Sequence, residues 1–198
     1  MIEIDKGKVA EAILGNLVAA LHILEGCADF SALIPEVRTN IAFALPNAQT
    51  PGEVAAFPGR ITVYRGHPHA VAAPDWGASD HLARRIIESR KYDKDVNAII
   101  NFGFEEKMLT TVQEYCQRGG MFLGCLDRSK EPTEIAKYDK ASMVWKVEQL
   151  FNKHGAIPRI YWEGPGWGKE PLFFVQGKDA VEVVSIAVEI AHLHASRS

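Results

Sequence analysis

Short apolar segments alternate with amphipathic helical segments along most of this chain of 198 residues. Such interleaving is typical of a sheet with helices packed on both faces. Two pairs of apolar segments, 60–64 with 70–73 and 160–162 with 172–176, are joined by short turns that predict hairpins. Hairpins place antiparallel neighbours in the sheet. We therefore expect a three-layer α/β/α sandwich built on a mixed sheet.

Apolar periodicity, capping residues and glycine or proline breakers define the expected elements. Helices are predicted at residues 6–25, 79–92, 105–117 and 140–153, and from a cap at Asp179 onward. Strands are predicted at residues 39–45, 60–64, 70–73, 97–102, 121–126, 160–162 and 172–176. The segment Gly66-His67-Pro68 should form the turn of the first hairpin.

Size and composition predict one domain over residues 1–198, with an N-terminal helix at 1–26 and a core at 27–195. The 22 Lys and Arg residues against 25 Asp and Glu leave a net charge of −3. That balance favours neither nucleic acid nor an anionic membrane as partner, so any phosphate binding must be local. We find no signal peptide and no apolar run of membrane-spanning length, and therefore expect a cytoplasmic protein.

The cysteines agree with that location. Cys27, Cys116 and Cys125 are odd in number and lack metal-type spacing. Buried thiols in a reducing compartment are the simplest interpretation.

The helix predicted at 79–92 begins with Ser79-Asp80-His81, directly after Gly77-Ala78. Ser79 or Asp80 is a good N-cap. The amides at a helix start suit a phosphate, which makes this segment a candidate for chemistry. An ordinary capped surface helix would have the same local sequence.

Gly164-Pro165-Gly166-Trp167-Gly168-Lys169-Glu170-Pro171 is a second candidate. It is not a Walker A motif, because the spacing is one residue short and Glu170 stands where Ser or Thr is needed. Its backbone amides could still surround a phosphate beside Lys169. A flexible turn between two strands is the alternative.

Histidines and charged loops offer weaker candidates. His67 and His69 would share one face of a strand and could join a zinc site, but Pro68 and the expected turn disfavour that geometry. Asp127 and Arg128 follow a buried strand, where ligands of α/β sheets gather, although they could simply be solvated. Arg38, Asn40 and Asn47 flank another strand and can equally be explained as turn residues.

Six segments, taken in order, resemble the ThiN-type thiamine-phosphate synthase domain from about Cys27 to the last helix. They are Val37-Arg38-Thr39-Asn40-Ile41, Ala44-Leu45-Pro46-Asn47-Ala48, Gly59-Arg60-Ile61, Gly77-Ala78-Ser79-Asp80-His81, Asp127-Arg128 with Glu131-Pro132, and Gly168-Lys169-Glu170-Pro171. The resemblance implies an AraD-like α/β/α sandwich whose sheet is mixed and mostly antiparallel. One departure is Lys146, where we expect a glycine after Trp145; it should not touch the residues that carry activity.

The resemblance also implies an activity. The reaction would join hydroxymethylpyrimidine diphosphate to thiazole phosphate, giving thiamine phosphate and diphosphate. Arg60 and His81 match the arginine and histidine that carry synthase activity in the family, so we expect an enzyme. Arg60 would bind a phosphate with its planar guanidinium, and His81 would donate a hydrogen bond or a proton to the leaving oxygen. Mg²⁺ would bridge diphosphate oxygens, with Asp80 or Asp127 as ligand.

Further residues are expected to bind the phosphorylated substrates. They are Arg38, Asn40, Asn47, Ser79, Asp80, Asp127, Arg128, Gly166, Gly168 and Lys169. In the family the domain occurs alone, fused to a hydroxymethylpyrimidine kinase, or in a regulator, so a kinase partner is expected. An apolar content of 47% and the long first helix leave room for a homodimer. A non-catalytic sensor of thiamine phosphate and a metal-dependent aldolase using the histidine pair are the alternatives.

Overall fold

A mixed sheet is the centre of the computed structural model, which describes residues 6–166 and 169–197. The strands are β1 (Ile41–Ala44), β2 (Val54–Ala56), β3 (Ile61–Tyr64), β4 (His67–Ala70), β5 (Asp75–Trp76), β6 (Ala98–Gly103), β7 (Leu123–Leu126), β8 (Ile160–Glu163) and β9 (Leu172–Gly177). Within the described residues, seven of them form one sheet in the order β5-β2-β1-β6-β9-β8-β7. Its neighbours are antiparallel except for the parallel pair β7 and β8. The expected mixed, mostly antiparallel sheet is confirmed.

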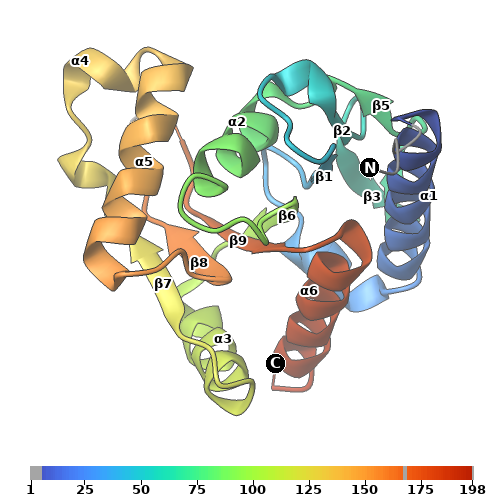
Figure 1. Cartoon of the computed structure of the whole chain (residues 1–198). Helices are drawn as coiled ribbons and strands as arrows, with labels where there is room; N and C mark the ends of the chain where they lie inside the picture. The colour runs from blue at the N-terminus through green and yellow to red at the C-terminus, as the bar shows by residue number, and fades with distance from the viewer. Residues whose placement is uncertain (1–5, 167–168, 198) are drawn as a thin grey trace.

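Helices cover both faces of this sheet, as Figure 1 shows. They are α1 (Lys6–Glu25), α2 (Asp80–Ser89), α3 (Glu106–Arg118), α4 (Thr133–Ala136), α5 (Asp139–His154) and α6 (Ala180–Ala195), with short 3₁₀ helices at Ala28–Leu33, Pro51–Glu53 and Arg128–Lys130. Leu82 and Ile86 of α2 pack with Ile99 of the sheet in one hydrophobic cluster. The cluster on the other face joins α1, α3 and α6 to the sheet. The three-layer α/β/α sandwich is therefore confirmed.

Helix α1 belongs to the hydrophobic core. Its buried residues Ile13, Leu17, Ala20 and Leu24 recur at helical spacing and share a cluster with α6. By length and composition alone, Gly7–Glu25 could cross a membrane, which corrects the expectation that the chain contains no such run. The buried stripe explains its apolar composition, because a helix that packs on a core needs the same residues.

The hairpin of β3 and β4 is where the sequence analysis located the turn wrongly. Tyr64 pairs with His67 and Thr62 with His69, so the segment His67-Pro68-His69 lies within a strand. The turn is formed by Arg65 and Gly66, with φ of 50° and 81°. Positive φ at both central residues matches the twist of a two-residue hairpin turn. Pro68 is tolerated because this sheet has only two strands, both of them edges.

The strands β2 and β5 were not predicted. They contain three and two residues, too few to show an alternating apolar pattern. β2 is buried and pairs with β1, while β5 closes that edge of the sheet. β2 forms because β1 offers it a partner, and β5 forms because β2 does, so both depend on non-local contacts.

Candidate active site

One cavity of about 300 Å³ lies between the sheet and the helices α2 and α5. Arg60 and His81, the two residues expected to carry activity, both line it. Arg60 directly precedes β3 and His81 lies in the first turn of α2, so the two residues are 21 positions apart along the chain. The remaining lining residues are Val37, Arg38, Asn40, Ser79, Leu82, Asn101, Arg128, Lys146, Glu163, Lys169, Leu172 and Phe174.

Arg38 and Arg60 are exposed and stand at the mouth of this cavity. The Arg38 Nη1 donates to the Gly59 carbonyl at 3.2 Å, and the Arg60 Nη1 donates to the Val37 carbonyl. Their backbones are held together by the paired residues Thr39 and Ile61. Each guanidinium still has donors that these contacts do not use, because arginine carries five N–H groups.

The side chains of Asn40 and Asn101 hydrogen-bond to the backbone beside this cavity mouth. The Asn40 side-chain oxygen accepts from the amides of Ile41 and Phe57 at 2.9 and 3.0 Å, and its Nδ2 donates to the Phe57 carbonyl at 3.0 Å. The Asn101 Nδ2 donates to the Arg38 carbonyl at 3.0 Å. Asn40 was expected to bind substrate through its amide. Asn40 lines the cavity, and its amide also fixes the backbone that presents Arg38 and Arg60.

The first turn of α2 brings Ser79 and His81 to the cavity. Ser79 is the N-cap, because its hydroxyl accepts from the Leu82 amide at 3.4 Å. His81 Nε2 lies 3.4 Å from the Arg85 guanidinium, one helical turn further along. A guanidinium only donates, so this Nε2 is an acceptor and the ring proton sits on Nδ1. Burial, together with the nearby Arg85, lowers the pKa of His81 to about 3, so His81 is neutral near pH 7.

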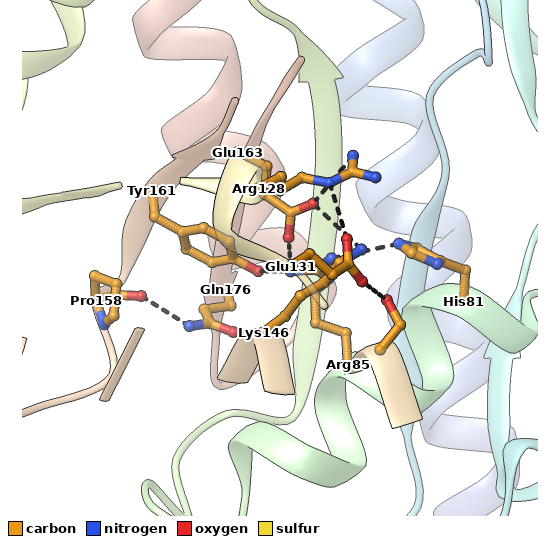
Figure 2. A network of polar contacts seen from close by, with 10 residues as sticks. His81, Arg85, Arg128, Glu131, Lys146, Pro158, Tyr161, Glu163 and Gln176 are labelled. Carbon is orange, nitrogen blue, oxygen red and sulfur yellow. Dashed lines mark hydrogen bonds and ion pairs between the residues drawn. The ribbon is translucent and has the colours of Figure 1, made fainter. Parts of the chain in front are cut away.

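Next to His81 lies a buried ionic network centred on Glu163, shown in Figure 2. Arg85, whose exposure is 0%, contacts Glu163 Oε1 at 2.5 Å and donates to the Tyr161 hydroxyl at 2.9 Å. Arg128 and Lys146 approach Glu163 Oε2 at 3.8 and 3.7 Å. Burial alone would raise the pKa of Glu163, but Arg85 and Lys146 hold it at about 2. Glu163 is therefore a buried carboxylate.

The charge of the cavity is strongly positive. Among its described lining residues, Arg38, Arg60, Arg128, Lys146 and Lys169 are five basic groups, and Glu163 is the one acidic group. Leu82, Leu172 and Phe174 add an apolar wall. A small cavity with an apolar wall and several cations suits an aromatic ligand that carries phosphate groups.

The sequence profile of the thiamine-phosphate synthase ThiN family matches residues 16–189. The chain belongs to the ThiN family. It is 35% identical over 181 residues to the thiamine-phosphate synthase ThiN of Methanothermobacter thermautotrophicus, covering 91% of this chain and 93% of that protein. It is 31% identical over 175 residues to the bifunctional thiamine biosynthesis protein ThiDN of Methanocaldococcus jannaschii, covering 88% of this chain and 39% of that protein.

Solved structures agree with the family assignment. The C-terminal domain of a phosphomethylpyrimidine kinase superposes with a TM-score of 0.82 at 28% identity. The match covers 94% of this chain and 100% of that domain. The ThiN family resemblance found in the sequence is thus confirmed at the level of fold as well.

The glycine-rich turn contributes to this ThiN cavity differently from the expectation. The Gly166 amide donates to the Lys169 carbonyl at 3.1 Å, so it is already used within the turn. A Cβ on Gly166 would lie 2.6 Å from Arg128 Nη2, so the bare glycine makes room for that guanidinium. Glu170 accepts from the Val37 amide at 2.7 Å and ties the turn to the cavity mouth. Gly168 lies outside the described residues.

Besides Gly166, three expected binding residues do not line the ThiN cavity. Asp80 is exposed and forms a paired contact with Arg84 at 2.6 and 2.8 Å. Asp127 faces solvent and accepts from Ser129, while the next residue, Arg128, is buried in the cavity wall. Asn47 lies in an exposed turn with φ of 61°, beside a different surface hollow. The interpretation of Asn47 as a turn residue explains its position.

The described residues contain no group of three or more His, Cys, Asp or Glu that could hold a metal ion. His67 Nδ1 lies 2.9 Å from the Glu25 carbonyl, and His69 Nδ1 lies 3.1 Å from the Glu25 carboxylate. The histidine pair therefore contacts the end of α1 and does not line the cavity. This arrangement gives the aldolase alternative no support.

Arg85, Glu163 and Lys146 are the site residues that the sequence analysis missed. Arg85 lies four positions after His81, so both share one face of α2, and this spacing was an available signal. Glu163 ends an apolar strand next to a glycine-rich turn. Lys146 was expected not to touch Arg60 or His81. The structure places it in the wall of the cavity that these two residues also line.

Proposed function

We propose that this chain is a thiamine-phosphate synthase that joins hydroxymethylpyrimidine diphosphate to thiazole phosphate. Its membership of the ThiN family and its similarity to a named synthase over 91% of its length support this activity. The single observation that carries the proposal is that Arg60 and His81 line one strongly cationic cavity. A sheltered cationic site is what a reaction that releases diphosphate needs.

In the proposed reaction, the thiazole nitrogen attacks the methylene carbon of the pyrimidine, and the carbon–oxygen bond to diphosphate breaks. The bonding electron pair leaves with the diphosphate oxygen, so negative charge grows there in the transition state. Arg60 and Arg38 at the mouth, with Lys169 beside them, are placed to stabilise that charge. Leu82, Leu172 and Phe174 would hold the planar rings in line for attack.

His81 has a narrower role than the sequence suggested. A histidine whose pKa lies at about 3 is neutral at physiological pH, so it does not supply a proton as an imidazolium. Its Nε2 faces Arg85, which leaves the Nδ1–H as its donor. We propose that this N–H donates a hydrogen bond to the leaving oxygen, while Arg85 positions the ring.

Magnesium is proposed as part of the diphosphate substrate, held by phosphate oxygens. The protein ligands first expected for it, Asp80 and Asp127, do not fit that role. Their carboxylates are engaged by Arg84 and Ser129, and neither residue lines the cavity. Glu163 is already neutralised by Arg85 and Lys146. The basic residues of the cavity would therefore stabilise the departing diphosphate.

The bifunctional relative motivates a proposed partner. It is named as a bifunctional thiamine biosynthesis protein, and this chain matches 39% of its length. We propose that a hydroxymethylpyrimidine kinase, fused or separate, supplies the diphosphate substrate. A homodimer, a cytoplasmic location and the absence of nucleic-acid or membrane partners are also proposals.

The decisive experiment is to incubate the purified protein with both phosphorylated precursors and Mg²⁺ and to measure thiamine phosphate and released diphosphate. Equal amounts of the two products, absent when either precursor is omitted, support the proposal. A calorimetric titration with thiamine phosphate runs beside it. Tight binding of thiamine phosphate without turnover would overturn the synthase assignment in favour of the sensor alternative.

A further inference from the structure

Lys146 is a buried lysine in the middle of α5. Its side chain is 1% exposed, and it lines the deep end of the cavity that holds Arg60 and His81. A lysine almost never becomes this buried without a counter-charge. The described residues provide one acidic contact, Glu163 Oε2, at 3.7 Å from Nζ.

Glu163 cannot satisfy Lys146 by itself. Its Oε1 is engaged by Arg85 at 2.5 Å, and its Oε2 is shared between Lys146 and Arg128 at 3.7 and 3.8 Å. Those separations are longer than hydrogen bonds. The carboxylate therefore supplies one negative charge to three cations.

Arg128 is also incompletely satisfied. It is 7% exposed, and its Nε has no hydrogen-bond partner among the described residues. The nearest acid besides Glu163 is Glu131, whose Oε2 lies 3.8 Å from that Nε. Glu131 itself accepts a hydrogen bond from the Ser142 hydroxyl. Lys146 and Arg128 are the two buried cations at the inner end of the cavity, which we call its floor. Both therefore have unused N–H donors and positive charge that is not fully neutralised.

We propose that Lys146, together with Arg128, forms a second anion-binding site at the floor of the cavity, which holds a phosphoryl group of a substrate. The mouth formed by Arg38 and Arg60 would hold the other phosphoryl group. An anion between Lys146 and Arg128 supplies the missing counter-charge and accepts the unused N–H groups. The inference rests on the proposed function only for the identity of the phosphorylated ligand.

Direct binding of inorganic diphosphate and inorganic phosphate tests the floor site without any catalysis. Lys146→Met keeps the length and apolar stem of the side chain and removes the charge. Calorimetry should show diphosphate affinity about tenfold to 100-fold weaker in Lys146→Met, the usual effect of losing one hydrogen bond to a charged group. Lys140→Met, on an exposed position of the same helix, should bind as the unchanged protein does.

The affinities for phosphate and diphosphate, compared between Lys146→Met and the unchanged protein, show whether the floor holds one phosphoryl group or the ligand must span the cavity. If the floor takes one phosphoryl group, Lys146→Met weakens both ligands by a similar factor. Equal binding by Lys146→Met and the unchanged protein would overturn the inference. So would an unchanged protein that binds neither ion.

A second measurement needs no variant, in case Lys146→Met fails to fold. Burial lowers the pKa of Lys146 to about 8, although Glu163 opposes this shift. Sulfate keeps its charge across that range, so its affinity for the unchanged protein should fall as the pH rises through about 8. The charged and titratable groups that face Lys146 are Arg85 and His81 of α2, Arg128 and Glu131 of the loop after β7, Glu163 of β8 and Lys169. A sulfate affinity independent of pH would count against the floor site.

The two proposals can fail separately. Weaker diphosphate binding in Lys146→Met without any thiamine phosphate production would keep the floor site and remove the synthase. Production of thiamine phosphate with unchanged diphosphate binding in Lys146→Met would do the reverse.

Discussion

Arg38 and Arg60 hold each other in place across the cavity mouth. Each guanidinium donates to a backbone carbonyl in the residue preceding the other arginine, Gly59 and Val37 respectively. Both arginines adopt left-handed backbone conformations, with φ of 66° and 65°. This conformation costs a residue with a side chain roughly 1–2 kcal/mol. Local strain is thus retained where two cations are presented to the cavity, as in many functional sites.

Substitutions of Arg60 are expected to lower activity without lowering stability to the same extent. Arg60→Ala should lower kcat/KM about 100-fold, because the cation acts mainly on charge that develops in the transition state. Arg60→Gly should lose as much activity but unfold at the same or a higher temperature, since glycine adopts φ of 65° without strain. Product assays and thermal unfolding check the two parts.

Arg65 is the matched control for Arg60. It is also exposed and left-handed, with φ of 50°, but lies in the β3–β4 turn and does not line the cavity. Arg65→Gly should keep full activity. Full activity in Arg60→Ala would remove the role assigned to Arg60.

Glu163 should be essential for stability. Glu163→Gln keeps the shape of the side chain but leaves Arg85, Arg128 and Lys146 without their shared carboxylate. Breaking one partner of a buried ion pair costs about 3–5 kcal/mol of unfolding free energy, which urea denaturation would measure. Glu105→Gln, whose partner Lys107 is exposed, should change stability little. Similar stabilities for the two variants would show that the network contributes little.

His81 should make the protein sensitive to acid. Its pKa is lowered from 6.5 in the unfolded chain to about 3 in the fold. Between these values the unfolded chain binds a proton that the folded protein does not, so stability is full above 6.5 and falls as the pH falls towards 3. In His81→Gln, stability should fall less steeply with falling pH. Urea midpoints measure this, and they are taken above pH 4.5, the ordinary pKa of Glu163, so that protonation of Glu163 does not enter the comparison.

The exposed His22 is the control for that measurement. His22→Gln should keep the acid dependence of the unchanged protein. An identical slope in His81→Gln would mean that His81 titrates in the fold much as it does in the unfolded chain.

Gly166 should be required for the placement of Arg128. The methyl group of Gly166→Ala would lie 2.6 Å from Arg128 Nη2 and 2.8 Å from Cζ, so the guanidinium must move. We expect diphosphate affinity to fall about tenfold or more, because a small displacement of a positioned group is costly. Calorimetry checks the affinity and thermal unfolding checks the fold.

Gly15 provides the comparison for Gly166. A Cβ at Gly15 meets nothing within 4 Å, in the interior of α1. Gly15→Ala should therefore raise stability by roughly 1 kcal/mol and leave diphosphate binding unchanged. Undiminished diphosphate binding by Gly166→Ala would show that Arg128 does not need this space.

Some elements could be read from the sequence because their signals are local. Helix α1 was predicted with its observed bounds, since its apolar stripe and the glycine that follows it are independent of the rest of the chain. The cap of α6 at Asp179 is equally local. Strands β2 and β5 were missed because each depends on a partner strand, β1 for β2 and β2 for β5. The segment His67-Pro68-His69 was misplaced because Arg65-Gly66 is an uncommon sequence for its turn.

By itself, the sequence determined the layered α/β/α architecture, the family, and the pair Arg60 and His81 as candidates for activity. Only the tertiary structure decided which charged groups reach the cavity: Arg128 does, whereas its neighbour Asp127 does not. It also decided the protonation of His81 and the burial of Glu163 with Lys146. The reason is physical, because the desolvation and charge that act on a side chain come from segments far away in the sequence.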